Sequence, residues 1–587
     1  MTITLRTSSR VLALAAVALP AFLSDALARA EGEVDLSPAL WDVGEIEKFL
    51  PLESALGQDK PLATGSSGVI CGSSSALAMR AGLEAMHQGG TAADAALTGS
   101  LMQIVMNIGA SVSCAGVLEM VYYDAVTQKV YALDAGFNTV LGEDDPQSIP
   151  TAAFMNPGQK PEPGPRGRTV LVPGFMAGLE VAHRRFGKLP FGEIFKPAIH
   201  FCEEGFPLTE RLERWINYRR DFLSRLEETK AVFTAENGEF HTAGDLLTQP
   251  ALAETLRAVV EHGADYMYHG PWAEHFVTAV QRDGGKITLD DLAAYEVQWG
   301  EPMHVTYRGF DVYTNPFAFA LPGALNLLEA AELSKLGHYG ESPETFYWLM
   351  KILRTVRFHP ELGILIGGSR QEDWTSKQIA ADVWQSLQDE VMKATGEGVE
   401  GGPGHTSSVV AVDRYGNVAS VTHSINTSLW GESGLFVDGV SIPDAACFQQ
   451  FLIEQTGPGR RMPNQTEPTI VLKEGRPVLA VSTIGTAIDY ETAKVLFNLM
   501  DFGMDPKEAI DAGVILASLG DHERVTEGEF SDELVEGVRQ MGMEVEVVDS
   551  RTAGRYRSSA VALAIDVESG LRIGGATSRF NGGALGY

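Results

Sequence analysis

The spacing of apolar residues predicts an early helix followed by a β-hairpin. Within residues 68–90, apolar side chains recur at helical intervals, and Gly89 and Gly90 follow them as a stop signal. The apolar positions of this helix are Leu77, Met79, Ala81, Leu83 and Met86. Two runs rich in β-branched and aromatic residues, GVLEMVYYD and KVYALDA, come next, and the short turn AVTQ joins them.

A long helical region is expected from the segment VPGFMAGLEVAHRRF to about Gln388, with short strands around YRGFDVYTNP. Before it, the uncharged stretch from Ala95 to Leu118 reads as a buried helix followed by a loop and a strand. A transmembrane helix is the less favoured alternative, because the polar run NIGASVS would fall in mid-span without partners.

The pattern changes after Asp389. A glycine-rich acidic stretch, ATGEGVEGGPG, has no periodicity and predicts an exposed loop. Three hairpin signals follow it, with helical patterns at TAKVLFNLMDFG and SDELVEGVRQMG between them. The hairpin strands are HTSSVVAVD with VASVTHS, TIVLK with PVLAVST, and SAVALAID with LRIGGAT. This order predicts an α+β sandwich rather than a doubly wound parallel sheet.

Composition and charge narrow the function. The 587 residues carry a formal net charge of −32, and such a surface disfavours nucleic acid and anionic membranes as partners. An enzyme or binding protein for small molecules remains. The four cysteines have no metal-ligand spacing, so we expect neither a metal site nor an organic cofactor. The sequence does not choose between disulfides and buried free thiols.

The first thirty residues resemble a secretory signal. Arg6 and Arg10 precede an apolar run over residues 11–23, and small residues permit cleavage after Ala28 or Ala30. An N-terminal membrane anchor is the alternative, although the run is short for a span. We therefore expect residues 1–30 to be a signal peptide and the mature protein to be periplasmic or extracellular, with no membrane attachment after signal removal.

The junction between the glycine-rich loop and the strand that begins at Thr406 suggests a cut site. If the bond between His405 and Thr406 breaks, Thr406 gains a free α-amine that can act as the base for its own hydroxyl. On composition alone, a glycine-rich loop that simply precedes a strand with hydroxyl residues is the favoured interpretation. Ser407 is the fallback nucleophile if the register differs by one residue.

Several ordered segments resemble the γ-glutamyltranspeptidase family of self-cleaving N-terminal-nucleophile hydrolases. They are GVICGSSSALAMRAGLEAMHQGGTAADAAL, VPGFMAGLEVAHRRFGKLPFGEIFKPAIHFCEEGFPLTERL, TLDDLAAYEVQWGEPMHVTYRGFDVYTNP, HTSSVVAVDRYGNVASVTHSINTSLWGESG, MDFGMDPKEAIDAG and GGATSRFNGGALGY. The resemblance implies a four-layer αββα sandwich. It also implies a large chain over 31–405 and a small catalytic chain over 406–587 that stay associated around one shared core.

The resemblance also assigns roles to single residues. It makes Thr406 the nucleophile, with Ser424 at the position of a hydroxyl that steadies it, and Asn426 a contact for the amino-acid head of the substrate. The oxyanion pair, backbone N–H groups that receive developing negative charge, falls on Ile484 and Gly485, where Ile replaces a family glycine. His423 reads as structural, because it faces the opposite side of the strand from its neighbour Ser424.

The chain departs from the family where the substrate carboxylate and ammonium are held. Gly136 and Phe137 stand where a carboxylate-binding Arg is expected, and Cys447 replaces an Asp. Asp444, three residues before Cys447, is a candidate replacement for the lost charge, and an ordinary solvated Asp is the alternative.

Three further positions complete the expected substrate site. Asn464 and Gln465 replace a serine pair of the family, and Arg460 or Arg461 are candidates for a displaced carboxylate anchor. The implied activity is hydrolysis or transfer of γ-glutamyl amides such as glutathione. Two alternatives stay open: an amidohydrolase that acts on another acyl group, and an inactive binding relative.

Overall fold

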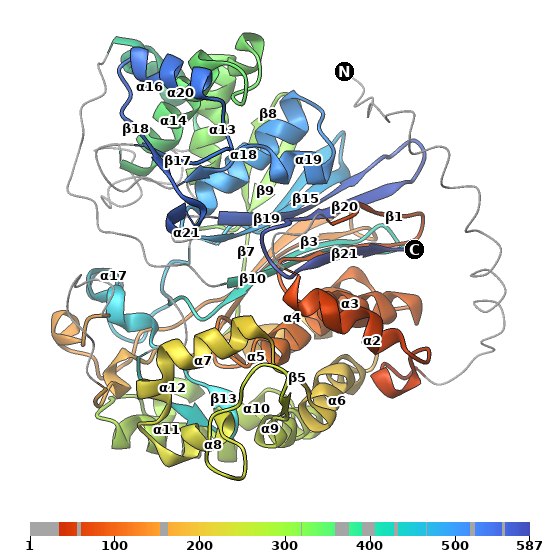
Figure 1. The fold of residues 1–587 in the computed structure, drawn as a ribbon, viewed down its shortest axis with the longest axis vertical. Coiled ribbons are helices and arrows are strands. Elements are labelled where there is room, and N and C mark those ends of the chain that lie inside the picture. The colour runs from red at the N-terminus through yellow and green to blue at the C-terminus, as the bar shows by residue number, and fades with distance from the viewer. Residues whose placement is uncertain are drawn as a thin grey trace.

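The computed structural model describes residues 34–55, 60–152, 163–318, 320–358, 375–389, 406–427, 432–464, 466–516, 523–553 and 558–587. The expected signal peptide, the loop 394–404, His405 and Gln465 lie outside these residues. Two seven-stranded antiparallel sheets form the centre of the molecule and lie one above the other (Figure 1).

The first sheet holds the predicted nucleophile strand at its centre. Its order is β21 (Gly583–Gly586), β2 (Val69–Gly72), β10 (Thr406–Val412), β11 (Val418–Ser424), β3 (Val117–Asp124), β4 (Lys129–Ala135) and β7 (Gln298–Gly300). The second sheet has the order β1 (Ala63–Gly65), β20 (Arg572–Ala576), β19 (Ser558–Ile565), β15 (Arg476–Gly485), β14 (Thr469–Lys473), β9 (Phe310–Thr314) and β8 (Met303–Tyr307).

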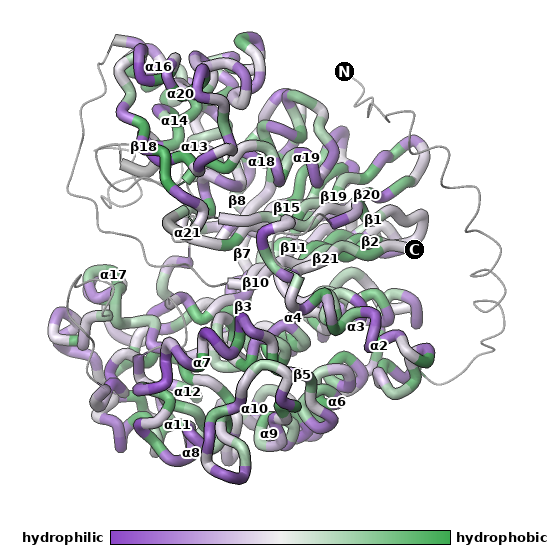
Figure 2. Tube along the Cα trace, in the orientation of Figure 1, coloured by the Kyte–Doolittle hydropathy of each residue, from purple (hydrophilic) through white to green (hydrophobic). Residues whose placement is uncertain are grey.

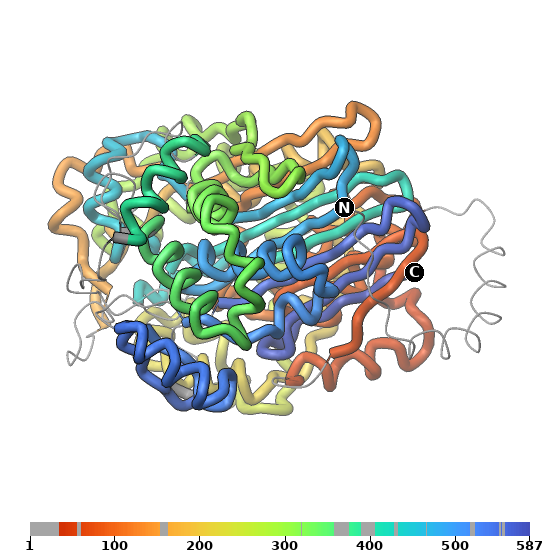
Figure 3. The backbone as a smooth tube through the Cα atoms, turned by 90° about the horizontal axis from the view of Figure 1, so that it is seen from above, coloured from red at the N-terminus to blue at the C-terminus, as the bar shows by residue number. Residues whose placement is uncertain are grey.

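Helices cover the outer face of each sheet. Below the first sheet lie α3 (Ala76–His87), α4 (Ala92–Met106) and α5 (Phe175–Phe186), with α6 (Lys196–Glu204), α7 (Glu210–Leu223), α9 (Pro250–His262), α10 (Asp265–Tyr268) and α11 (Pro271–Arg282) beyond them. Above the second lie α18 (Ile488–Asp501), α19 (Pro506–Asp511) and α13 (Ala320–Ala331), followed by α14 (Pro343–Phe358), α16 (Lys377–Asp389) and α20 (Asp532–Gln540). Seen from above, the helices of the upper layer lie across the strands beneath them (Figure 3). The predicted α+β, four-layer αββα architecture is confirmed.

Smaller elements decorate this sandwich. A separate three-stranded sheet contains β16 (Ile515–Leu516), β17 (Glu523–Thr526) and β18 (Val545–Val548), and two-stranded pairs join β5 (Phe206–Pro207) to β6 (Leu246–Leu247) and β12 (Phe436–Val437) to β13 (Val440–Ser441). The short helices are α2 (Glu45–Phe49), α8 (Glu227–Phe233), α12 (Leu289–Ala293), α17 (Gln450–Thr456) and α21 (Ser550–Ala553).

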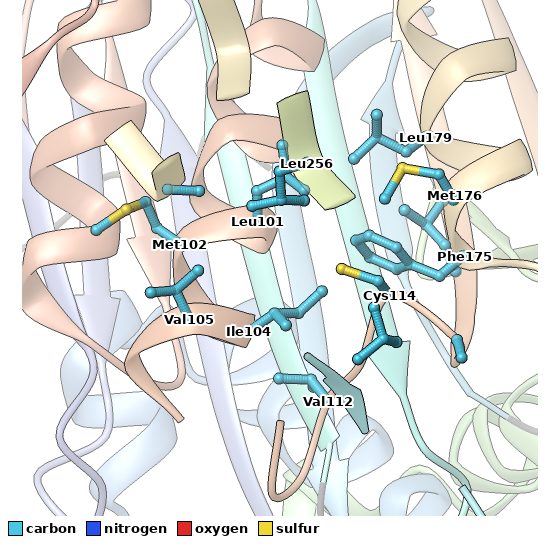
Figure 4. Packing of buried hydrophobic residues seen from close by; sticks show 14 of the residues in the cluster. Leu101, Met102, Ile104, Val105, Val112, Cys114, Phe175, Met176, Leu179 and Leu256 are labelled. Atoms are coloured by element: carbon cyan, nitrogen blue, oxygen red, sulfur yellow. The ribbon is translucent and has the colours of Figure 1, made fainter. Parts of the chain in front are cut away.

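Helix α4 is buried on all sides, as the uncharged stretch that begins at Ala95 predicts. Its N-terminus is closed by a capping box, in which the side chains of Thr91 and Asp94 each accept from the other's backbone N–H. Leu101 lies beside Leu256 of α9, and Phe175, Met176 and Leu179 of α5 belong to the same apolar cluster (Figure 4). Apolar stretches run through both sheets and through the helices that face them (Figure 2). Among the described residues, none of the helices combines the length and apolar character needed to cross a bilayer.

The predicted hairpins are present, and the short strand β2 was missed. β3 pairs with β4, β10 with β11, β14 with β15, and β19 with β20, all antiparallel. The start of the segment expected as the early helix forms β2, and the helix itself begins at Ala76. Strand β2 is four residues long and pairs with β10, which is distant in the sequence. A local sequence pattern does not predict pairing between strands that are so far apart in the chain.

Both sheets contain strands from each side of the expected cut. In the first sheet, β10, β11 and β21 come from residues after 405, whereas β2, β3, β4 and β7 come from before it. The second sheet is mixed in the same way. A break before Thr406 would therefore leave two chains that share one core. The four cysteines are buried free thiols.

Candidate active site

The candidate nucleophile is the first residue of a central strand. Thr406 opens β10 and pairs with Ser424, the last residue of β11. Their hydroxyl oxygens lie 3.0 Å apart, and the backbone N–H of Asn426 donates to the Ser424 hydroxyl at 2.9 Å. Asn426 has a φ of +47°, a left-handed conformation that Asn tolerates better than most residues. This turn aims its N–H back at Ser424.

Successive side chains of a strand point to opposite faces of the sheet, so the two candidate nucleophiles, Thr406 and Ser407, lie on different faces. Thr422 bonds to Ser482 of the second sheet at 2.8 Å, so Ser424 and its partner Thr406 also face that sheet. Ser407 faces the opposite side, where its hydroxyl lies 2.8 Å from that of Ser74. Ser407 is therefore turned toward the helices and away from the face that carries Thr406.

The expected oxyanion loop ends strand β15 at the same edge of the sandwich. The Ser420 hydroxyl donates to the Val481 carbonyl at 2.8 Å, and the next contact along both strands joins Thr422 to Ser482. β11 and β15 thus run in the same direction, and the end of β15 at Ile484 and Gly485 lies toward Ser424. Gly485 has a φ of +119°, which a residue with a side chain rarely adopts. Gly485 therefore adopts a backbone conformation that glycine favours, even though Ile484 stands where the family has its other glycine.

Asp444 is a buried carboxylate with one oxygen unused. Its Oδ2 accepts the backbone N–H of Glu432 at 2.6 Å, while its Oδ1 has no hydrogen-bond partner within the described part of the chain. Glu432 itself pairs with Arg166 at 3.1 Å. Burial, with a further contribution from the charges of Asp444 and Glu432, raises the pKa of the Cys447 thiol well above its usual value. Cys447 is thus a buried neutral group, and Asp444 is not the solvated surface residue of the alternative interpretation.

Asn464 belongs to a buried polar network. Its amide nitrogen donates to Oε1 of Glu119 at 3.1 Å, and Asn315 donates to Oε2 at the same distance. Glu119 pairs across the sheet with Asp134. Burial, and next the nearby Asp134 charge, raise the pKa of Glu119 well above that of an exposed Glu. The side-chain amide of Asn464 therefore already donates a hydrogen bond to a carboxyl group of the protein itself.

Arg461 is committed to the same network. Its guanidinium donates to Oδ1 of Asp134 at 2.8 Å and to the side chain of Asn138 at 2.8 Å, and it lies over the Tyr295 ring. A side chain at position 136 has no room, because a Cβ built on Gly136 would lie 2.9 Å from Asp134 Oδ1 and 3.3 Å from Arg461 Cδ. The stem of Arg461 thus fills the space beside Gly136.

Comparison with known proteins decides the family. The model of the family described as gamma-glutamyltranspeptidase matches residues 78–587. The chain belongs to the γ-glutamyltranspeptidase family.

Two relatives and one solved structure show what this chain is similar to. The glutathione hydrolase proenzyme of Pseudomonas sp. (strain A14) is 26% identical over 74% of this chain and 79% of its own length. The acylase ACY 1 proenzyme of Pseudomonas sp. (strain SE83) is 28% identical over 59% of this chain, and the match spans 63% of that relative. The fold is similar to that of cephalosporin acylase from Bacillus halodurans, with a TM-score of 0.72, 20% identity, and coverage of 90% and 97% of the two chains.

Within this γ-glutamyltranspeptidase-family fold, the structure brings together one group of the candidate residues that the sequence predicted, and it places near them further residues that the sequence analysis missed. Thr406, Ser424 and Asn426 come together, and Ile484 and Gly485 lie at the same end of the sandwich. Asp444 and Asn464 lie in two separate buried clusters. The missed residues are Ser73, Ser74 and Gln103, which contact the start of β10 from the helical side. Gln103 is polar in an otherwise largely apolar helix, and this was the available signal.

Proposed function

We propose that this member of the γ-glutamyltranspeptidase family is a precursor that cleaves itself between His405 and Thr406. The new N-terminal threonine then hydrolyses small-molecule amides or transfers their acyl group. The observation that carries the proposal is the 3.0 Å contact between the hydroxyls of Thr406 and Ser424, at the first residue of a central strand. The expected signal peptide over 1–30 would deliver the precursor to the periplasm or the cell exterior.

The reaction needs only groups of this chain. The α-amine of Thr406 accepts the proton of the Thr406 hydroxyl while Oγ1 attacks the amide carbonyl carbon. Backbone N–H groups of the loop at Ile484 and Gly485 stabilise the resulting oxyanion. The amine then passes its proton to the departing nitrogen, so that the C–N bond breaks and an acyl ester on Thr406 remains. Water or an acceptor amine attacks this ester and restores the threonine.

Ser424 has a defined part in this scheme. Its oxygen accepts the N–H of Asn426 at 2.9 Å and lies 3.0 Å from Thr406 Oγ1, a contact in which either hydroxyl can be the donor. A hydroxyl that donates to Thr406 Oγ1 stabilises the negative charge that develops there as the proton leaves. It also holds the Thr406 side chain in one rotamer before attack.

N-terminal sequencing of the purified mature protein tests the cleavage. We expect two chains, of which one begins Thr406-Ser407-Ser408 and the other near residue 29 or 31. The two should coelute on gel filtration, because both sheets take strands from each. An active preparation that consists of a single uncut chain contradicts the proposal, and an uncut inactive chain would identify a binding relative.

γ-Glutamyl amides such as glutathione are the first candidate substrates. In this assignment the unpartnered Oδ1 of Asp444 accepts the substrate ammonium, while Asn426, Asn464 and Gln465 serve the amino-acid head. A second candidate is an amide whose acyl group lacks the α-carboxylate. It is favoured by one observation: Arg461, the cation beside Gly136, already pairs with Asp134. The similarity to an acylase proenzyme is consistent with this second candidate.

A panel of anilides separates the two candidates. If the γ-glutamyl anilide is the substrate, Asp444→Asn should raise its KM roughly tenfold with little change in kcat, since one charged contact of about 1.5 kcal/mol is lost. Asp532→Asn, on the exposed first turn of α20, is the matched control and should change neither constant. If acyl anilides without α-amine and α-carboxylate are hydrolysed faster and are indifferent to Asp444→Asn, the second candidate is correct.

A further inference from the structure

The start of the nucleophile strand is paired on one edge only. β2 runs beside β10 from Val412 to Val409, where Gly72 is the last partner. The chain then turns away through Ser73 into helix α3, and β11 continues alone to Thr406. The turn is tight, since Ser75 has a φ of +58°. Residues 406–408 therefore lack a neighbouring strand on the side of β2.

Polar groups of the preceding segment replace the missing strand. The backbone N–H of Ser73 donates to the Ser408 carbonyl at 3.0 Å, and the Ser408 N–H donates to the Ser73 hydroxyl at 2.9 Å. One residue closer to the cut, the hydroxyls of Ser74 and Ser407 lie 2.8 Å apart. We call Ser73, Ser74 and Gln103 the strand clamp.

Gln103 of α4 connects the clamp. Its amide nitrogen donates to the carbonyls of Ser74 at 3.0 Å and Ser408 at 3.2 Å. These two bonds fix the orientation of the amide, so Oε1 must accept from Nε2 of His423 at 2.7 Å. Burial lowers the pKa of His423 to about 3, which keeps the imidazole neutral with its proton on Nε2. All of these side chains are buried.

We propose that Gln103 is a positioning residue for the N-terminal nucleophile, acting through Ser74 and Ser408 on the backbone that carries Thr406. The inference rests on the proposed function. Scission before Thr406 removes the covalent restraint on its N-terminal side, and the clamp then holds the new chain end from residues of the large chain. A shift of about 1 Å in a reacting atom costs roughly a hundredfold in rate, so the clamp acts on kcat and not on substrate affinity.

The test compares Gln103→Met with Ser100→Ala in the purified full-length protein. Met keeps the volume and removes the three hydrogen bonds of the amide. Ser100 lies on the same helix, and within the described part of the chain its hydroxyl bonds to the Ala96 carbonyl of that helix alone. We expect Gln103→Met to be cleaved into two chains and to lose kcat by about 10- to 100-fold with KM within about twofold. Ser100→Ala should keep the wild-type kcat.

Measurements of stability and a second pair of variants distinguish a positioning role of Gln103 from a purely structural one. Thermal unfolding of both variants is measured, because a purely structural role of Gln103 would lower Tm and leave the kcat of the folded fraction unchanged. If Gln103→Met does not fold, Ser73→Ala and Ser74→Ala each remove a single hydroxyl of the clamp and should lower kcat, by less than Gln103→Met would, at unchanged KM. Unchanged kcat in every folded clamp variant overturns the inference. Failure of the wild-type protein to cleave or turn over overturns the proposed function instead.

Discussion

Thr406→Ala should yield a single uncut chain with no measurable amide hydrolysis. The substitution removes the hydroxyl that lies 3.0 Å from Ser424, which is the proposed attacking group in both self-cleavage and turnover. Loss of a nucleophile that forms a covalent intermediate lowers the rate by at least about a thousandfold. Gel electrophoresis of the purified protein and hydrolysis of the best anilide substrate measure the two effects separately.

Ser407→Ala is the matched control for this prediction. It removes the same hydroxyl one residue later, from a side chain that faces Ser74 on the helical side of the sheet. We expect normal cleavage and at most a modest loss of kcat, because one clamp contact disappears. Normal cleavage and turnover in Thr406→Ala, or their loss in Ser407→Ala alone, would assign the chemistry to Ser407.

Thr406→Ser tests whether the presence of the hydroxyl or its orientation limits turnover. A serine keeps the nucleophilic oxygen and the α-amine after cleavage, so both chains and partial activity are expected. The lost methyl group frees rotation about χ1, which lowers the fraction of hydroxyl held toward Ser424. A fully inactive Thr406→Ser that is nonetheless cleaved would show that positioning of the hydroxyl, rather than its presence, limits turnover.

Local patterns in the sequence predicted the strands and helices that interact with near neighbours. The β10–β11 hairpin is an example, since alternating Val and Ala residues flank the turn at RYGN. That hairpin fixes the register that places Ser424 opposite Thr406. The geometry of the nucleophile therefore follows largely from a local signal.

The contacts that complete the site come from distant parts of the chain, and no local pattern reports them. Gln103 reaches Ser408 across more than three hundred positions, and Glu119 meets Asn464 across a similar interval. Their polar side chains in apolar segments were visible in the sequence. Their partners depend on how the two sheets and the helical layers stack, which is a property of the whole fold.

The contacts of Arg461, at the expected substrate site, likewise could not be predicted from a local pattern in the sequence. The sequence presented Arg460 and Arg461 as equal candidates for a displaced carboxylate anchor. In the structure, the Arg461 side chain is 5% exposed and bonded to Asp134, whereas Arg460 is exposed. Arg461 compensates the buried carboxyl pair of Glu119 and Asp134, which is a structural use of its charge.

Arg461→Ala should consequently destabilise the fold strongly. It leaves two buried carboxyl groups with no cation, and removal of one partner of a buried ion pair costs about 3 to 5 kcal/mol. The loss should grow with pH. The folded pKa of Glu119 is raised above its unfolded value by burial and by Asp134, so this group favours the folded state at low pH and costs stability as pH rises through the folded pKa. Urea unfolding at pH 5 and pH 8 measures both effects.

Arg460→Ala provides the control, because it removes a neighbouring cation that is exposed. We expect its urea midpoint to match that of the wild type within error at both pH values. If Arg461 instead bound the substrate carboxylate, its removal would raise the KM for carboxylate-bearing substrates and leave the urea midpoint unchanged. If Arg461→Ala showed that pattern, the guanidinium would leave Asp134 to bind substrate, and the first candidate substrate class would be favoured. If it unfolds more easily and spares the KM of the folded fraction, the described network contains no cation free for a substrate carboxylate, and an acyl group without that carboxylate fits the site better.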